Sequence, residues 1–114
     1  GELAKRITCR AIQADPELNG IFVSSMGRRG VAKALQETGT AGKIHMIIHD
    51  ITLSNLSLVR QGIVDFVIGQ DIETQGTRPI QILYEYLSNH QMPEQRIQLT
   101  DISIKFRCNI PPEA

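Results

Sequence analysis

The sequence lacks several features that define large classes of proteins. It has no excess of either charge, because 12 Lys and Arg residues balance 12 Asp and Glu residues. Proteins that bind nucleic acid need a basic surface, so this chain by itself is not expected to bind DNA or RNA. No apolar run approaches the roughly 20 residues that span a bilayer, and no signal peptide is visible. We therefore expect no membrane contact and a cytoplasmic location.

Motifs for metal binding and catalysis are missing as well. The two cysteines, Cys9 and Cys108, form no CxxC pair, so we predict two reduced, half-buried thiols rather than a disulfide. His45, His49 and His90 have no metal-ligand spacing. There is no GxSxG elbow, and nothing in the sequence orders a Ser–His–Asp triad. We predict a protein that is not an enzyme and that holds no metal or cofactor.

What the sequence does contain is a regular alternation of helix and strand patterns. It has no initiator Met and enters a helical pattern at Glu2, so we expect a fragment or a trimmed chain. Thr52 is expected to be the N-cap of the helix that follows it, and Asp71 is expected to be a helix cap rather than a ligand contact. Because Pro79 disfavours a helix interior, we expect the last helix at 77–90. The predicted helices are 2–14, 31–38, 53–61 and 77–90, and the predicted strands are 21–23, 44–48, 64–68 and 102–108.

This order predicts an α/β fold with a mostly parallel sheet and helices on both faces. The runs 21–23, 44–48 and 64–68 are continuously apolar, which is typical of strands that are buried on both faces. In the last strand, apolar residues alternate with polar ones, which predicts an edge strand with one wet face. Ligands of such sheets bind beyond the carboxyl ends of the strands. The candidate site therefore lies at 24–25, 49–50 and 69–70.

Two of these strand ends carry versatile polar side chains. Asp50 follows a buried strand, where its carboxylate can accept hydrogen bonds from vicinal hydroxyls or cap the following helix. Gln70 offers donors and an acceptor, which suits a sugar hydroxyl, but taken in isolation its pattern slightly favours a polar loop residue. The sequence leaves both pairs of alternatives open.

The segment after the first strand, residues 24–30, allows more interpretations. It contains Gly27-x-x-Gly30, part of the dinucleotide fingerprint, with Ser25 in place of the first glycine. Asp50 follows Gly27 by 23 residues, near the spacing of the ribose-binding acid. Arg28 and Arg29 can hold a phosphate or carboxylate beside a helix N-terminus, or form a solvated basic turn.

Taken together, these residues resemble a known family. The series consists of 15–23, 30–39, the strand ending in Ile47-Ile48-His49-Asp50, the stretch 60–71, and Gln75-Gly76. It resembles the C-terminal part of the effector domain of LacI/GalR-type transcription regulators, a fold shared with sugar-binding proteins of ABC transporters (periplasmic-binding-protein type I). The resemblance covers nearly the whole chain.

The resemblance implies a two-lobed sensor that closes on a small ligand, usually a sugar. It implies that Asp50 binds ligand hydroxyls and that Gln70 lies at the cleft and hinge. The loop with Ser24, Ser25 and Met26 stands where relatives often offer Asn or Asp, and the arginines after it, Arg28 included, are compatible with an acidic or phosphorylated sugar.

The resemblance also implies an organisation. Residues 1–70 would form the C-terminal lobe of an effector-binding domain, and 71–114 would supply a crossover helix and strands that partly complete the N-terminal lobe. Most of that lobe and any DNA-binding headpiece are absent from this chain. The apolar helix 77–90 is expected to pack back on this piece or to be exchanged with a second copy, giving a homodimer.

Three functions follow. The first is the effector-sensing part of a LacI-type regulator, which acts on operator DNA through a domain that is not in this chain. The alternative is a sugar-binding protein of an ABC transporter. A third, from another class, is an NAD-binding Rossmann fragment that uses Gly27, Gly30 and Asp50.

Overall fold

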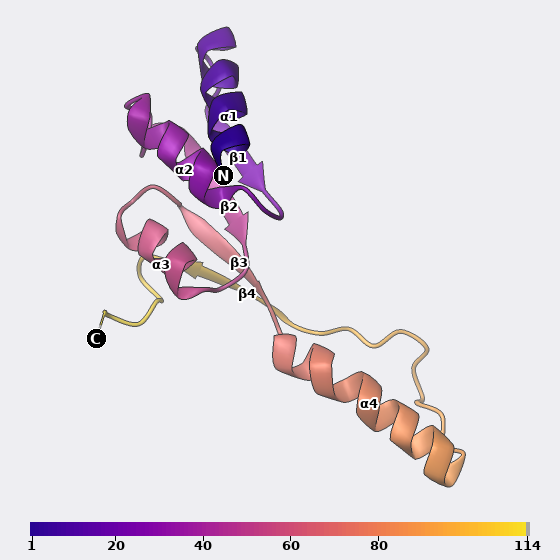
Figure 1. Cartoon of the computed structure of the whole chain (residues 1–114). Coiled ribbons are helices and arrows are strands. Elements are labelled where there is room, and N and C mark those ends of the chain that lie inside the picture. The colour runs from indigo at the N-terminus through magenta and orange to yellow at the C-terminus, as the bar shows by residue number, and fades with distance from the viewer. Residues whose placement is uncertain (114) are drawn as a thin grey trace. The chain divides into compact units, whose positions relative to one another are not determined.

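A computed structural model describes residues 1–113 (Figure 1). Helices and strands alternate, and the chain divides into two compact units: unit 1 is Gly1–Gly69 with the segment that starts at Ile104, and unit 2 is Gln70–Ser103. No helix within residues 1–113 is both long and apolar enough to cross a membrane. The elements are α1 (Glu2–Ala14), β1 (Gly20–Val23), α2 (Arg28–Glu37), β2 (His45–His49), α3 (Leu53–Arg60), β3 (Phe66–Gln70), α4 (Ile72–Asn89) and β4 (Ile102–Phe106).

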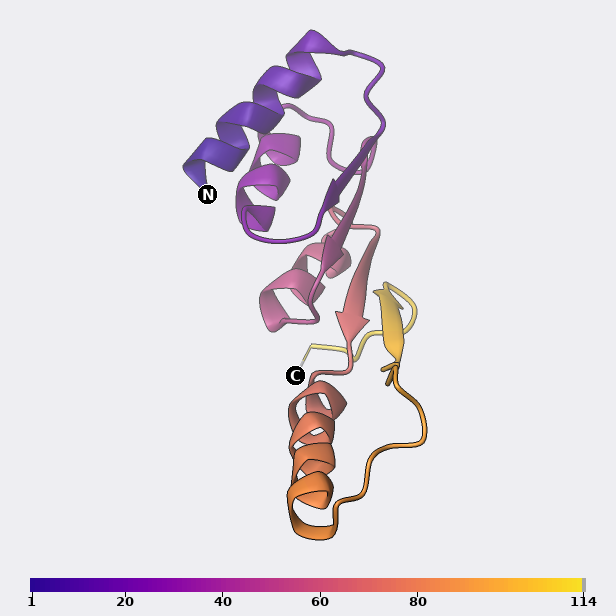
Figure 2. The ribbon, with the colours of Figure 1, turned by 90° about the vertical axis from the view of Figure 1, so that its right-hand side faces the viewer.

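The strands form one four-stranded sheet in the order β1-β2-β3-β4. β1 pairs with β2 in parallel, with Phe22 opposite Ile47, and β2 pairs with β3 in parallel, with Ile48 opposite Val67. In Figures 1 and 2 the β4 arrow runs opposite to β3. The structure confirms the predicted α/β class, the mostly parallel sheet and the edge position of the last strand. The third strand was predicted two residues too early, since β3 ends at Gln70.

Helices cover one face of the sheet and leave the other face open, a difference that the sequence did not predict. Strands that follow one another in sequence order, joined by right-handed crossovers, carry their connecting helices on the same face. Figure 2 shows α1, α2 and α3 on one side of β1 to β3. Met46, Ile48 and Val67 point to that side and are fully buried. On the other side Phe22 is 58% exposed, so the prediction that 21–23 is buried on both faces is wrong.

In the edge strand β4 too, the face of the sheet without helices is the exposed one. Its apolar residues Ile104 and Phe106 are exposed, whereas Lys105 between them is half-buried. The alternation of the strand is as predicted, but its apolar face is the open one in this chain. The helix-covered face is already occupied by side chains of α2, α3, β2 and β3.

Helices α1 and α2 pack against each other at one end of unit 1. Ala4 and Ile12 of α1 pack against the core, in which Leu35 of α2 is fully buried. At the surface, Lys5 Nζ lies 3.3 Å from a carboxylate oxygen of Glu2 and 3.4 Å from one of Glu37, which joins the two helices. Hydrogen bonds to these two carboxylates raise the pKa of Lys5.

Unit 2 is dominated by α4, and here the predicted start of the helix at 77 is wrong. The helix begins at Ile72, with Pro79 in its interior. An interior proline leaves the carbonyl four residues before it without its N–H partner, which costs about 3 kcal/mol. The helix nevertheless begins directly after Asp71, whose Oδ1 accepts from Thr74 N at 3.0 Å, and this confirms the predicted cap. Hydrogen bonds with the side chain and the backbone of Thr74 lower the pKa of the Asp71 carboxyl group.

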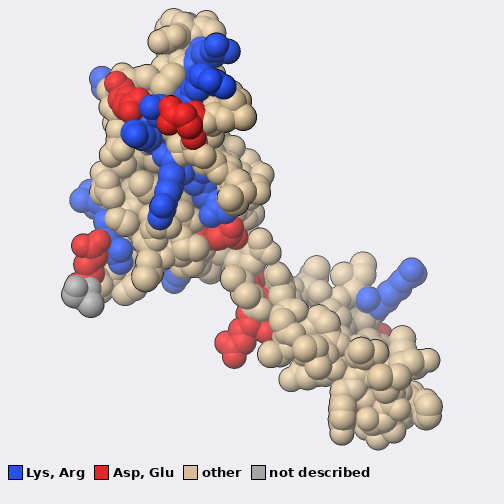
Figure 3. Space-filling model, in the orientation of Figure 1, with Lys and Arg blue, Asp and Glu red and all other residues tan. Residues whose placement is uncertain are grey.

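No residue of α4 is buried. Apolar side chains along it, such as Ile80 and Leu87, are exposed by more than three fifths, at 69% and 66%. Within unit 2, a groove of about 830 Å³ runs between α4 and the segment that follows it, and Ile82, Leu83 and Tyr86 line it. Figure 3 shows acidic and basic side chains interleaved over unit 1, while the visible surface of unit 2 is mostly uncharged.

The two cysteines are both free among the residues that the structure describes. Cys9 is half-buried, as predicted, but Cys108 is exposed, because it follows the uncovered edge strand.

Candidate functional site

Asp50 stands directly after β2 and has an unusual backbone conformation. Its φ is 76°, in the left-handed region that residues other than glycine seldom adopt. Its N–H donates to the carbonyl of Ile68 at 2.9 Å, so the ladder between β2 and β3 continues to Asp50. Such backbone strain persists only where the surroundings enforce it, and it gathers at functional sites.

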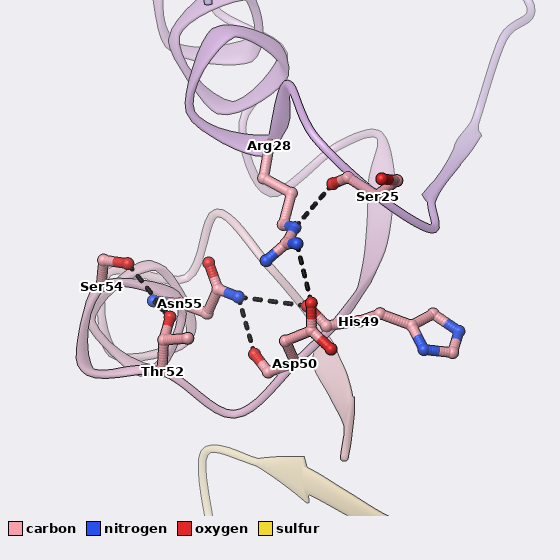
Figure 4. A network of polar contacts seen from close by, with 7 residues as sticks. All are labelled: Ser25, Arg28, His49, Asp50, Thr52, Ser54 and Asn55. Carbon is pink, nitrogen blue, oxygen red and sulfur yellow. Dashed lines mark hydrogen bonds and ion pairs between the residues drawn. The ribbon is translucent and has the colours of Figure 1, made fainter. Parts of the chain in front are cut away.

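An arginine from another element holds the side chain of Asp50. Arg28 is the first residue of α2, and its Nη2 lies 2.8 Å from Asp50 Oδ2 (Figure 4). The guanidinium is itself fixed, because its Nε donates to the carbonyl of Ser25 at 2.8 Å. The Arg28 side chain is 18% exposed and that of Asp50 39% exposed, so the pair lies at the rim of the core rather than in free solvent.

Asn55 fixes the backbone at the same place. This residue of α3 is 4% exposed, and its Nδ2 donates to the carbonyl of Asp50 at 2.7 Å and to that of His49 at 3.1 Å. The amide thus donates to two successive carbonyls at the end of β2, and the carbonyl of Asp50 also accepts from Thr52 N at 3.1 Å. Asn55 was not predicted from the sequence, because a single buried Asn in a short helix gives no pattern by which to find it.

The structure excludes one of the two roles left open for Asp50. The cap of α3 is Thr52, as predicted, and its side chain accepts from Asn55 N at 3.2 Å. The Asp50 carboxylate is directed to Arg28 instead. The capping role for Asp50 is therefore wrong, and its carboxylate remains available at the strand end.

The other predicted residues fall into different positions. Ser25 contributes its backbone carbonyl to Arg28, while Ser24 and Met26 are exposed on the same loop. Gln70 is the exposed last residue of β3, and its Oε1 accepts from Gln75 Nε2 at 3.4 Å. The structure thus joins Ser25, Arg28 and Asp50 in one network.

The two glycines of the Gly27-x-x-Gly30 stretch have a packing role. A Cβ atom at Gly30 would meet the carbonyl oxygen of Gly1 at 2.1 Å, and one at Gly27 would meet the Cβ of Ala4 at 3.0 Å. Gly27 also has a φ of 97° as the N-cap of α2. Both glycines are needed because α1 approaches α2 closely here, so the dinucleotide interpretation loses its principal support.

A hollow of about 250 Å³ adjoins the network, and Met26, Arg28 and Asn55 contribute to its lining. The site offers acceptor oxygens on Asp50 and N–H donors on Arg28 within one rigid frame. This combination suits hydroxyl groups, which donate and accept at once. Within residues 1–113, no group of three or more His, Cys, Asp or Glu side chains is placed to hold a metal ion.

Comparison with known proteins gives a consistent result. The family described as "Periplasmic binding protein domain" matches residues 1–91. No curated protein matches the chain. Solved structures match most of it, at sequence identities that speak for the fold alone.

One such structure is GanP, a glucose-galactose binding protein from Geobacillus stearothermophilus, with a TM-score of 0.85 and 15% identity over 97% of this chain. A second is an ABC transporter solute binding protein from Agrobacterium vitis with bound D-fucose, with a TM-score of 0.79 and 24% identity over 93%. A third is the sugar-binding protein of a sugar ABC transporter from Bacillus halodurans, with a TM-score of 0.79 and 23% identity over 93%. The chain covers 39%, 36% and 40% of these proteins, about two fifths of their length.

Proposed function

The chain belongs to the periplasmic binding protein domain family, and from this membership we propose that it forms part of a sugar-binding protein that serves an ABC transporter. The observation that carries the proposal is the end of β2. There the partly exposed carboxylate of Asp50, a residue with a φ of 76°, is held by Arg28, while Asn55 holds the backbone carbonyl of the same residue. A carboxylate paired with a guanidinium is well suited to a pair of sugar hydroxyls.

The names of the structural neighbours support a transport protein over a transcription regulator. Several are sugar-binding proteins of transporters, and one was solved with D-fucose and another with α-D-tagatopyranose. The sequence favoured a LacI-type regulator instead. That interpretation remains the rival, with its homodimer, operator DNA and cytoplasmic location, but no neighbour named here is a regulator.

We assign Asp50 as the principal ligand residue. Ser24, Ser25, Met26 and Gln70 are proposed as further contacts, because they lie on the segments that follow β1 or end β3. The lobe assignment of 1–70 and 71–114 also stays a prediction. In this proposal the main role of Arg28 is to hold the Asp50 carboxylate in place, and not to bind an anion.

The test is a thermal-shift and calorimetric screen with D-galactose, D-glucose, D-fucose and D-arabinose. A sugar present at 100 times its Kd should stabilise the folded protein by about 2.7 kcal/mol. Asp50→Ala should abolish this stabilisation, whereas Glu17→Gln, which changes an exposed carboxylate, should leave it unchanged. Equal stabilisation of the Asp50→Ala protein by the same sugar concentration would remove Asp50 from its assigned role.

A further inference from the structure

The charges of the candidate site are arranged in a way that bears on the class of sugar. Arg28 and Asp50 are 22 residues apart in sequence, yet their side chains meet at 2.8 Å. The pair uses only part of each group. Asp50 Oδ2 accepts from Arg28, and within residues 1–113 no side chain donates to Oδ1. A guanidinium has five N–H donors, of which Nε serves Ser25 and one on Nη2 serves Asp50.

The remaining groups form a neutral recognition unit. The formal charges of Arg28 and Asp50 cancel, so the unit offers one free acceptor and several free donors without a net charge. A pair of vicinal hydroxyls can donate to Oδ1 and accept from the guanidinium in one geometry. A carboxylate or phosphate can use only the N–H donors of Arg28. It would also lie close to the negatively charged carboxylate of Asp50, and two like charges in contact repel each other.

We propose that Arg28 is a specificity-determining residue of this site, which orients Asp50 for hydroxyl binding while Asp50 masks its positive charge. The site then selects neutral polyhydroxy ligands and rejects acidic or phosphorylated sugars. This inference rests on the proposed sugar-binding function. It also argues against an acidic or phosphorylated sugar, with which the arginines after β1 had been compatible on sequence alone.

The test compares each neutral sugar with its acidic form: D-galactose with D-galacturonate, and D-glucose with D-glucuronate and D-glucose 6-phosphate. Calorimetry gives the ratio of the two dissociation constants. Asp50→Asn keeps the size of the side chain but unmasks Arg28. It should weaken neutral sugar binding and shift the ratio toward the acidic form by about tenfold or more.

Three further variants separate this role from a merely structural one. Arg28→Met should weaken neutral sugar binding by about ten- to a hundredfold, and Arg28→Lys should restore part of it, because it keeps the charge but not the fork. Arg28→Met combined with Asp50→Asn should lose the gain for acidic sugars, since that gain depends on the guanidinium. Lys33→Met removes a positive charge from the same helix at an exposed position and should leave the ratio unchanged.

The outcomes are distinguishable. If the unsubstituted protein binds none of these sugars, the proposed function and the inference fall together. If it binds a neutral sugar but the Asp50→Asn ratio does not move, or moves equally without Arg28, only the inference falls. Tighter binding of an acidic sugar than of its neutral form by the unsubstituted protein also overturns it.

Discussion

Asn55 shows how much of the candidate site rests on one buried amide. Its Nδ2 supplies donors to the carbonyls of His49 and Asp50, and these hold Asp50 at a strained φ of 76°. Replacing Asn55 by Ala removes this donor from both carbonyls, of which that of Asp50 keeps only its bond from Thr52 N, and this should cost about 1–3 kcal/mol of unfolding free energy. Urea unfolding followed by circular dichroism measures this.

The matched control is Asn89→Ala. Asn89 also donates from Nδ2, at 2.8 Å to Glu85, but on an exposed surface. Its replacement should change the stability by no more than about 0.5 kcal/mol. An equal effect of the two substitutions would show that Asn55 does not support the strand end.

At this scale, the sequence predicted residues whose roles are local. The side chains of Thr52 and Asp71 each accept from the backbone N–H three residues ahead, so the pattern that reveals these caps lies within one helical turn. The partner of Asp50 was not predictable in the same way, because Arg28 reaches it through the tertiary fold. Arg28 was recognised as a site candidate, but the sequence left open whether it holds an anion or forms part of a solvated basic turn.

The contact between α1 and α2 gives a prediction at the scale of elements. Gly30 is buried in α2, and any side chain there would strike the backbone of Gly1. Gly30→Ala should therefore force the helices apart and destabilise the protein by about 1–3 kcal/mol. Thermal unfolding of the variant measures the loss.

Gly76 is the natural comparison, because it is also a helical glycine and a Cβ atom there meets nothing within 4 Å. Gly76→Ala should favour α4 by about 0.5–1 kcal/mol through a lower backbone entropy in the unfolded chain. Two substitutions of the same chemistry should thus have opposite signs. A stabilising Gly30→Ala would disprove the close packing of α1 on α2.

Element existence was predictable, whereas the burial of each face was not. All eight helices and strands appear near their expected positions, since apolar periodicity encodes them directly. A continuous apolar run such as 21–23 does not tell which face a helix covers. That depends on strand order, and the order β1-β2-β3 puts α2 and α3 together and leaves Phe22 exposed. The start of α4 was missed because Pro79 was weighed above the local cap at Asp71.

At the scale of the whole molecule, the resemblance predicted the fold correctly and ranked the functions less well. The stretches that carry it lie in the strands and turns that two functional groups share, so they specify the fold before the partner. The family match over residues 1–91 supports the same conclusion. A regulator and a transport protein differ in their partners and in the surfaces that bind those partners. The sheet that they share gives no information about either.

The two units should differ in stability. The core of unit 1 contains the fully buried Leu35, Met46 and Val67, whereas α4 of unit 2 has no buried residue. An uncovered helix of this length is marginal in water, because tertiary packing supplies most helical stability. Amides of α4 should therefore exchange with deuterium at least about a hundredfold faster than those of β2, after correction for their intrinsic rates.

The deuterium protection of α4 also tests the prediction that this helix is swapped between two copies of the chain. If α4 is uncovered in solution, its protection should stay low at every protein concentration, and light scattering should give the mass of a monomer. If a second copy covers its apolar side chains, protection of α4 should rise with concentration together with the measured mass. Strong protection of α4 in a monomer would contradict the exchange and would favour the other predicted arrangement, in which the helix packs back on this piece.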